Sequence, residues 1–175
     1  MQELKRGGWA EVSSSLIPVL VRQAAEETRA AVVCDLQLGE GIYGTVIIRW
    51  FRHDPEAQWD QKRRVTEPDR ALAILNAIPF HSQMKGFSVS HEVDSNTMVI
   101  WVRADLPAPG AAFVVAHECR HTWQRLQGDE CDQPETDAIT YALRAPVEPH
   151  LQDGMVRWHS EQPVIEGEYP PREEL

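Results

Sequence analysis

The chain has 175 residues, 42% of them hydrophobic, and its 17 lysine and arginine residues are outnumbered by 27 aspartate and glutamate residues, which gives a formal charge of −10. This length suits one globular domain with its own apolar core. The charge disfavours nucleic acid and anionic lipid as partners, because both are bound through clustered basic side chains. Three cysteines cannot complete a disulfide framework, so we expect reduced thiols.

Membrane insertion and export are not expected from the sequence. The longest apolar runs, such as 98–102 and 111–116, are far shorter than the roughly 20 residues that span a bilayer. An apolar patch at 16–21 is interrupted by Pro18 and is followed by charges, not by the small residues of a signal-peptide cleavage site. These features predict a cytoplasmic protein.

The first half of the chain predicts a helix, a hairpin and a second helix. Residues 13–31 carry apolar side chains at helical spacing behind a serine cap. The runs 31–38 and 44–52 are typical of strands, and the glycines between them suit a hairpin turn. We expect an irregular or briefly helical segment over 53–67 and a helix over 68–78, which has a regular apolar stripe.

The second half predicts another hairpin and then two helices. The runs 87–93 and 97–104 are β-rich, and the three residues between Val93 and Thr97 suit a tight reversal. After a proline-rich break, residues 111–126 have the pattern of a helix that ends near a glycine. Another helix is expected to begin around Gln133 and Pro134 and to end before Pro146.

The last thirty residues are rich in proline and acidic side chains, and we expect them to be extended or wrapped over the surface. This divides the chain into a domain over 1–145 and a tail over 146–175. The order of elements predicts an α+β fold, in which a small twisted antiparallel or mixed sheet packs against helices.

The most informative residues are 117–121, His-Glu-Cys-Arg-His, an H-E-x-x-H motif inside the predicted helix 111–126. Residues four apart lie about 40° apart around a helix and one turn along it, so His117 and His121 project from one face and can share a metal ion. Glu118 lies about 100° further round, where it can act on a metal-bound water without ligating the metal. The spacing therefore predicts a zinc site.

A catalytic zinc ion needs a third protein ligand and an open position for water. The metzincin pattern would continue with Gly and His where this chain has Gln124 and Gln127, which excludes that subclass. The next predicted helix offers Glu135 and Asp137. Glu135 shares the small, apolar side of that helix, which would pack toward the motif helix. We therefore prefer Glu135 as the ligand and Asp137 as a group that orients a histidine.

These residues resemble the gluzincin metallopeptidases, which carry H-E-x-x-H on one helix and a glutamate ligand on the next. The likeness covers about 97–142, and Glu135 with Ala138 is similar to the E-x-x-A pattern of the minimal gluzincins and of bacterial and phage H-E-x-x-H domains. The resemblance implies a zincin-like fold, with a strand at 97–104 that binds the substrate backbone in extended form.

By the same resemblance, His117, His121 and Glu135 match the Zn²⁺ ligands and Glu118 matches the general base. We therefore expect a zinc-dependent metallopeptidase that hydrolyses protein or peptide substrates. The alternative is a zincin-like domain that binds a partner or assists assembly, with structural zinc and little or no hydrolysis. A DNA-associated protease resembling the SprT-like group is disfavoured by the charge of −10. The sequence leaves the oligomeric state open.

Residues around the motif have simpler expected roles. Cys119 lies on the back of the motif helix and is expected in the core. Arg120 and Arg125 are expected to be solvated and to pair with the acidic loop that follows the helix. The donor that would stabilise a tetrahedral oxyanion has three candidates: Tyr141, His150 and His159.

Overall fold

The computed structural model describes residues 9–39, 44–54, 84–91, 94, 96–128 and 131–163. Most of the predicted segment 53–67, the predicted helix 68–78 and the end of the chain after residue 163 lie outside them. No described helix has both the length and the apolar composition needed to cross a membrane. The elements are β1 (Trp9–Val12), the 3₁₀ helix η1 (Ser14–Leu16), α1 (Val19–Leu36), β2 (Thr45–His53), β3 (Gly86–Ser90), β4 (Thr97–Arg103), α4 (Ala108–Leu126), α5 (Pro134–Leu143) and α6 (Pro149–Ser160).

The described strands form one mixed sheet in the order β1-β2-β4-β3. β2 and β4 run parallel, with Thr45 opposite Thr97, whereas β1 pairs antiparallel with β2 and β3 pairs antiparallel with β4. β4 therefore has a hydrogen-bonded strand on each side. β3 forms the outer edge of the described sheet next to β4.

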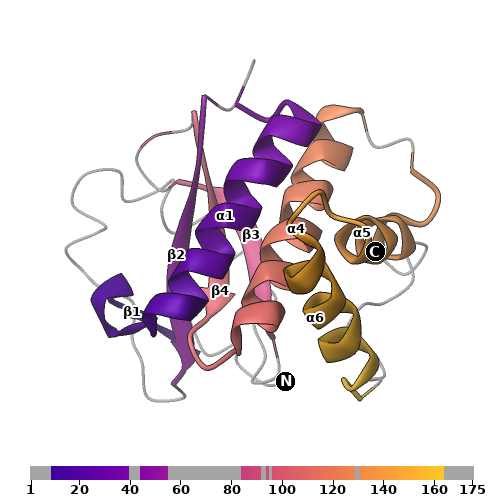
Figure 1. Ribbon diagram of the computed structural model, residues 1–175. Coiled ribbons are helices and arrows are strands. Elements are labelled where there is room, and N and C mark those ends of the chain that lie inside the picture. Colours follow the sequence, from indigo (N-terminus) through magenta and orange to yellow (C-terminus); the bar gives the residue numbers. More distant parts are fainter. Residues whose placement is uncertain are drawn as a thin grey trace, which may run out of the picture.

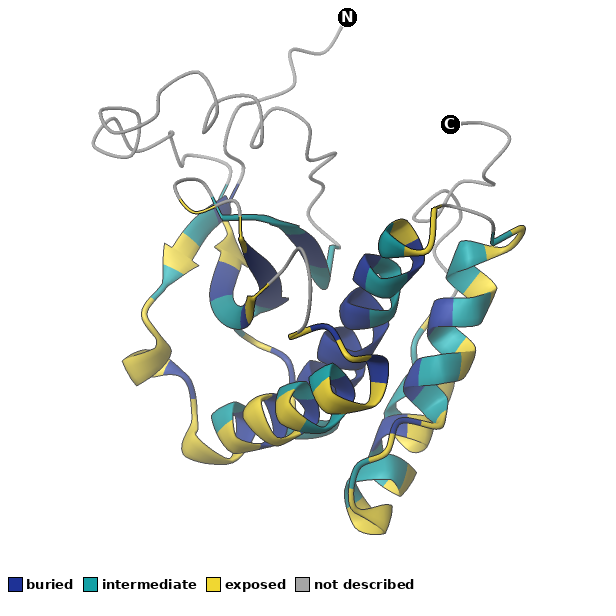
Figure 2. Cartoon of the chain, turned by 90° about the horizontal axis from the view of Figure 1, so that it is seen from above, coloured by how far each residue is buried: buried dark blue, intermediate teal, exposed yellow. Residues whose placement is uncertain are grey.

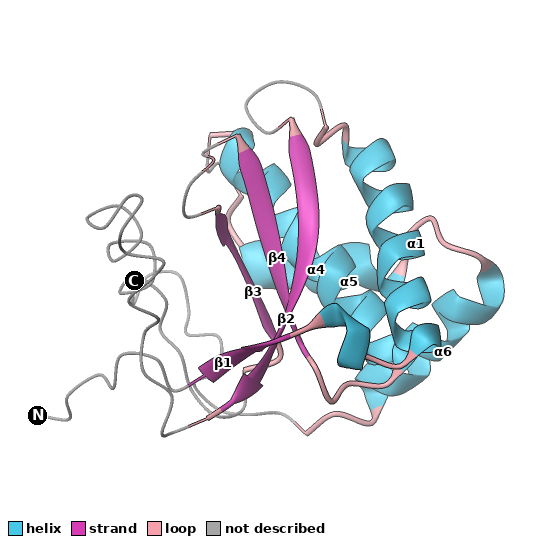
Figure 3. Cartoon of the chain, turned by 90° about the vertical axis from the view of Figure 1, so that its left-hand side faces the viewer, coloured by secondary structure: helices cyan, strands magenta, loops and turns pink. Residues whose placement is uncertain are grey.

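The described α-helices lie on one side of this sheet, with α5 and α6 packed on α4, and the described part of the chain is an α+β fold (Figures 1 and 3). α4 is the central helix, because it contacts α1, α5 and α6 as well as strands β3 and β4. Buried residues gather where the helices meet the sheet, and exposed residues lie on the outer faces of the helices (Figure 2).

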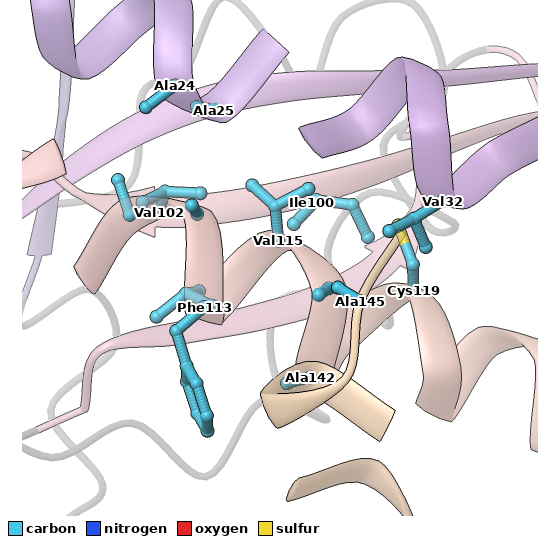
Figure 4. Close-up of a cluster of buried hydrophobic side chains, with 14 of the residues drawn as sticks. Ala24, Ala25, Val32, Ile100, Val102, Phe113, Val115, Cys119, Ala142 and Ala145 are labelled. Carbon is cyan, nitrogen blue, oxygen red and sulfur yellow. The ribbon is translucent and has the colours of Figure 1, made fainter. Parts of the chain in front are cut away.

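β4 alternates its side chains between two apolar cores, as expected for a strand that is covered on both faces. Ile100 and its alternate neighbours face the helices, and Figure 4 shows Val115 of α4 beside Ile100. Val99 and Trp101 face the other side, where they join a largely aromatic core. The ring centroids of Trp101 and Trp9 lie 4.8 Å apart there, in an edge-to-face arrangement.

Three sequence-based predictions in the second half are confirmed. β3 and β4 form the expected antiparallel hairpin, with Phe87 opposite Trp101. α4 covers the predicted helix 111–126 and begins three residues earlier, at Ala108, because Pro109 is compatible with the first turn of a helix. α5 begins at Pro134 as expected, and Gly128 takes a left-handed φ of 86° just after α4 ends.

The predicted hairpin between 31–38 and 44–52 is wrong. α1 continues through the first of these runs to Leu36 and ends where Gln37 adopts φ 56°. Val32 and Leu36 are buried on the helical stripe of Ala25, facing α4, so burial of this stripe outweighs the β-preference of the local valines. The second run does form a strand, β2, but it pairs with β1 and β4.

The expectation of extended chain after residue 145 is wrong for α6. Pro149 occupies the first turn of this helix, and the side chain of Glu148 caps it by accepting a hydrogen bond from the amide of Leu151. α6 packs on α4 so closely that a Cβ on Gly110 would lie 2.7 Å from the ring of Trp158. Pro149 thus belongs to the start of a helix and is not a sign of irregular structure.

Candidate metal centre

The structure brings His117, His121 and Glu135 together at the junction of α4 and α5. Nε2 of His117 lies 3.1 Å from Oε2 of Glu135, and Nε2 of His121 lies 2.5 Å from Oε1 of the same carboxylate. One ligand atom from each residue can be chosen so that all three lie within 4.8 Å of one another. Two imidazole nitrogens and one carboxylate oxygen are a donor set that suits Zn²⁺ and leaves a position open.

The packing of α5 on α4 decides which acidic residue reaches the histidines. Ala138 and Ala142 are fully buried against α4, and their small side chains let the two helices approach closely. Glu135 lies on the same side of α5 and therefore points at the histidines. Asp137 lies elsewhere on the helix and accepts hydrogen bonds from Nε and Nη2 of Arg120, at 2.7 and 3.2 Å.

Arg120 is a structural clamp between α4 and α5. In addition to its two-point contact with Asp137, its guanidinium lies 3.9 Å from the ring centroid of Trp123 and 5.0 Å from that of Tyr141. The expectation that Arg120 is solvated is therefore wrong. The clamp fixes the rotation of α5 about its axis, and this rotation determines where Glu135 points.

Hydrogen bonds determine which nitrogen of His121 carries its proton. Nε2 of Gln124 donates to the carbonyl of Pro134 at 2.9 Å and to Asp137 at 2.8 Å, and both partners can only accept. This orients Oε1 of Gln124 toward Nδ1 of His121, 2.8 Å away. Nδ1 must therefore be the donor, which leaves the lone pair of the neutral ring on Nε2.

His117 is oriented in the same way by a different partner. Its Nδ1 lies 3.0 Å from Oε2 of Glu118, and a carboxylate can only accept. When both rings are neutral, the two histidines direct their Nε2 lone pairs at the carboxylate oxygens of Glu135. Acceptors that face each other at these distances repel unless a cation, either a proton or a metal ion, lies between them. The donor set therefore fits a metal ion.

The same contacts shift the pKa values of the candidate ligands. Burial lowers the pKa of His117, but its hydrogen bonds to Glu118 and Glu135 outweigh burial and raise the pKa to about 9. Burial raises the pKa of Glu135, but its hydrogen bonds to His117 and His121 outweigh burial and lower the pKa to about 2. The centre is thus built to hold positive charge beside a negative carboxylate.

Glu118 is 7% exposed and contacts Nδ1 of His117, so in this structure its carboxylate orients that ring. Burial alone would raise the pKa of Glu118, but the hydrogen bond to His117 and the charges of His121 and Arg125 lower it. The group is therefore ionised at neutral pH. Glu118 is not one of the three clustered residues that could hold a metal ion.

Gln124 is the residue of this site that the sequence analysis missed. Its side-chain amide donates to Asp137 through Nε2 and faces Nδ1 of His121 through Oε1. Asp137 therefore orients His121 only indirectly, through this amide. The spacing indicates that Gln124 can contact His121, because a residue three positions further along a helix lies beside it.

The three expected oxyanion donors are placed differently relative to the candidate metal centre. Tyr141 donates its hydroxyl to Asp35 of α1 at 2.6 Å, and His150 is exposed in the first turn of α6. The ring of His159 stacks on Phe113 with centroids 4.9 Å apart, and Phe113 stacks on His117 at 5.9 Å. Of the three candidates, His159 is therefore the one linked to the centre, through Phe113.

The strand that was expected to bind substrate is β4, and this expectation is wrong. β4 is paired with β2 on one side and with β3 on the other, so its backbone groups are used within the sheet. Its outer neighbour β3 has the free edge in the described part of the sheet.

No family model, curated protein or solved structure matches this chain. The class of the site is therefore defined by its own donor atoms: two histidines on one helix, a glutamate on the next and a second glutamate within the motif. None of the three cysteines forms a disulfide, and Cys119 is buried in the core as expected.

Proposed function

We propose that the protein is a zinc-dependent metallopeptidase of the gluzincin type, in which His117, His121 and Glu135 hold Zn²⁺. The observation that carries the proposal is the arrangement of the histidines. Each has Nδ1 occupied by another side chain and Nε2 directed at one carboxylate. When bound, the ion would polarise a scissile carbonyl and acidify a water molecule.

Glu118 is the general base in this proposal. It is ionised at neutral pH and lies next to a ligand in the sequence, so it can accept a proton from water and pass it to the leaving amine. Its carboxylate has to leave Nδ1 of His117 to do so, which requires a side-chain rotation. Gln124 keeps His121 in the ligating tautomer throughout.

One observation favours the second candidate, a zincin-like binding or assembly module with structural zinc. The contact of Glu118 with Nδ1 of His117 is that of a supporting group, and both side chains are largely enclosed, at 7% and 3% exposure. In such a module Glu118 would stabilise the ligand His117 without performing proton transfer. The Glu118→Gln variant separates the two functions.

The first test measures zinc by elemental mass spectrometry in protein purified without added metal. Wild type is expected to hold near-stoichiometric zinc, and Glu135→Ala is expected to lose most of it because two ligands hold zinc weakly. Glu27→Ala is the matched control, since Glu27 is exposed on α1. Absence of zinc from folded wild type would contradict the proposed metal centre.

The second test measures cleavage of a quenched-fluorescent peptide library by the zinc-loaded protein. Glu118→Gln is expected to retain zinc and to lose turnover by at least about 100-fold, the lower range for loss of a general base. Normal cleavage by this variant would exclude the mechanism. Retained zinc with no cleavage by wild type would favour the binding module.

A further inference from the structure

α4 carries one more charged side chain on the face of the metal centre. Arg125 follows His121 by four residues and Glu118 by seven, a spacing that places these side chains on one side of a helix. Nη2 of Arg125 donates to Oγ of Ser88 at 2.9 Å. Arg125 therefore reaches from the motif helix to the edge strand β3.

Ser88 holds the arginine without neutralising it. Its hydroxyl is uncharged and buried at 8% exposure, on the helix-facing side of β3. Among the described residues no carboxylate lies within ion-pairing distance of Arg125. This distinguishes it from several other arginines, each of which is paired with a carboxylate: Arg29, Arg49, Arg103 and Arg120.

The guanidinium is available to a ligand. Arg125 is exposed, and its contact with Ser88 leaves other N–H donors of the planar group unused in the described structure. A fork of parallel donors matches both oxygens of a carboxylate. In a chain with a formal charge of −10, a fixed and unpaired cation beside a metal centre is where an anionic group is attracted.

We propose that Arg125, held by Ser88, binds a carboxylate of the peptide substrate and makes the protein selective for anionic peptides. The inference rests on the proposed peptidase function and adds a substrate class to it. The carboxylate is either a free C-terminus or an acidic side chain, and the bidentate chemistry is the same for both. The neutral hydroxyl of Ser88 serves to position the guanidinium.

The test measures peptide binding by calorimetry to the zinc-loaded Glu118→Gln variant, which cannot turn over the ligand. One arm compares acetyl-tetraalanine that has a free C-terminus with its C-terminal amide. Another arm compares amidated pentapeptides that carry a single Glu or a single Gln at each position in turn. The arm that shows the preference identifies the source of the carboxylate.

The expected result is at least about tenfold tighter binding of one acidic peptide over its neutral partner, the scale of a charge-assisted bidentate pair. Adding Arg125→Gln should abolish the preference and leave zinc content and Tm unchanged, whereas Arg125→Lys should retain part of it. Ser88→Ala should weaken it as well. Arg157→Gln, an exposed arginine of α6, is the matched control and should keep the preference.

The proposal is overturned if acidic and neutral peptides bind equally, if neither binds, or if the preference survives Arg125→Gln, since zinc alone would then attract the carboxylate. Failure of the peptidase proposal gives a different pattern: the preference for acidic peptides is present and depends on Arg125, but wild type cleaves none of them. That pattern would make the site a carboxylate-binding module.

Discussion

At the scale of single residues, the proposed metal centre depends on amide and carboxylate side chains that hydrogen-bond the far nitrogens of its two histidines. Two acceptors, the carbonyl of Pro134 and the carboxylate of Asp137, fix the orientation of the Gln124 amide. Its Oε1 then accepts a hydrogen bond from Nδ1 of His121. Glu118 does the same for His117. Each Nδ1 is thereby occupied by another side chain, which leaves Nε2 of each imidazole directed at Glu135.

Replacing Gln124 should therefore weaken metal binding without unfolding the protein. Gln124→Ala is expected to lower zinc affinity by about 10–100-fold, the usual effect of losing a partner behind a ligand. Competition with a chromophoric chelator measures the affinity. Gln127→Ala is the matched control, because Gln127 is exposed at the end of the same helix. Equal affinities for the two variants would show that Gln124 does not position His121.

At the scale of elements, the centre depends on how α5 is held between its neighbours. The clamp of Arg120 and Asp137 joins α5 to α4, and the hydroxyl of Tyr141 joins it to Asp35 of α1. Burial and the contact with Asp35 raise the pKa of Tyr141 well above its ordinary value of 10. The neutral phenol is thus the form that the folded protein favours.

This second link predicts a pH-dependent contribution to stability. Tyr141→Phe should lower the free energy of unfolding by about 1 kcal/mol, the scale of one hydrogen bond. Because the folded pKa is raised, the contribution is present below about pH 10 and is lost as the pH rises above that value, where the tyrosine of the unfolded chain ionises.

Urea unfolding of wild type and Tyr141→Phe at about pH 8 and about pH 11 measures this contribution. The difference between the two proteins should shrink at the higher pH. In an Asp35→Ala background, Tyr141→Phe should have little effect, because the partner of the hydroxyl is already absent. An undiminished effect in that background would assign the loss of stability to packing of the ring.

At the scale of the whole molecule, the candidate metal centre joins α4, which packs on the sheet, to α5, which packs on α4. α4 packs against the sheet and the other described α-helices (Figure 1), and His117 on it is buried at 3% exposure, whereas the side chain of His121 is 15% exposed. Glu135 is supplied from α5. Metal binding should therefore stabilise the folded chain as a unit, because the unfolded chain has no preformed site.

Zinc at about 100-fold above its Kd should add about 2.7 kcal/mol to the free energy of unfolding. For a domain of this size that corresponds to a rise in Tm of about 5–10 °C. Thermal denaturation with and without a chelator measures the rise. Glu135→Ala should show almost none, and magnesium should not replace zinc. An equal rise in Glu135→Ala would mean that zinc binds elsewhere.

The sequence by itself determined the features that depend on neighbouring residues. The helical pattern over 111–126 predicted α4, Pro134 and Pro146 predicted the bounds of α5, and the β-rich runs around residues 94–96 predicted the β3-β4 hairpin. The common face of His117 and His121 follows from helix geometry alone, because residues one turn apart project together. The preference for Glu135 also had a local basis in the small, apolar side that it shares with Ala138.

Only the tertiary structure decided the features that depend on contacts between distant segments. Residues 31–36 are helical because Val32 and Leu36 are buried against α4, a contact that the local valine-rich pattern does not contain. β4 is an interior strand because β2 pairs with the edge that β3 leaves open. Likewise, Gln124 hydrogen-bonds α5 and Arg125 hydrogen-bonds β3, and these partners lie at least ten residues away in the chain. A periodic pattern within one segment cannot specify such partners.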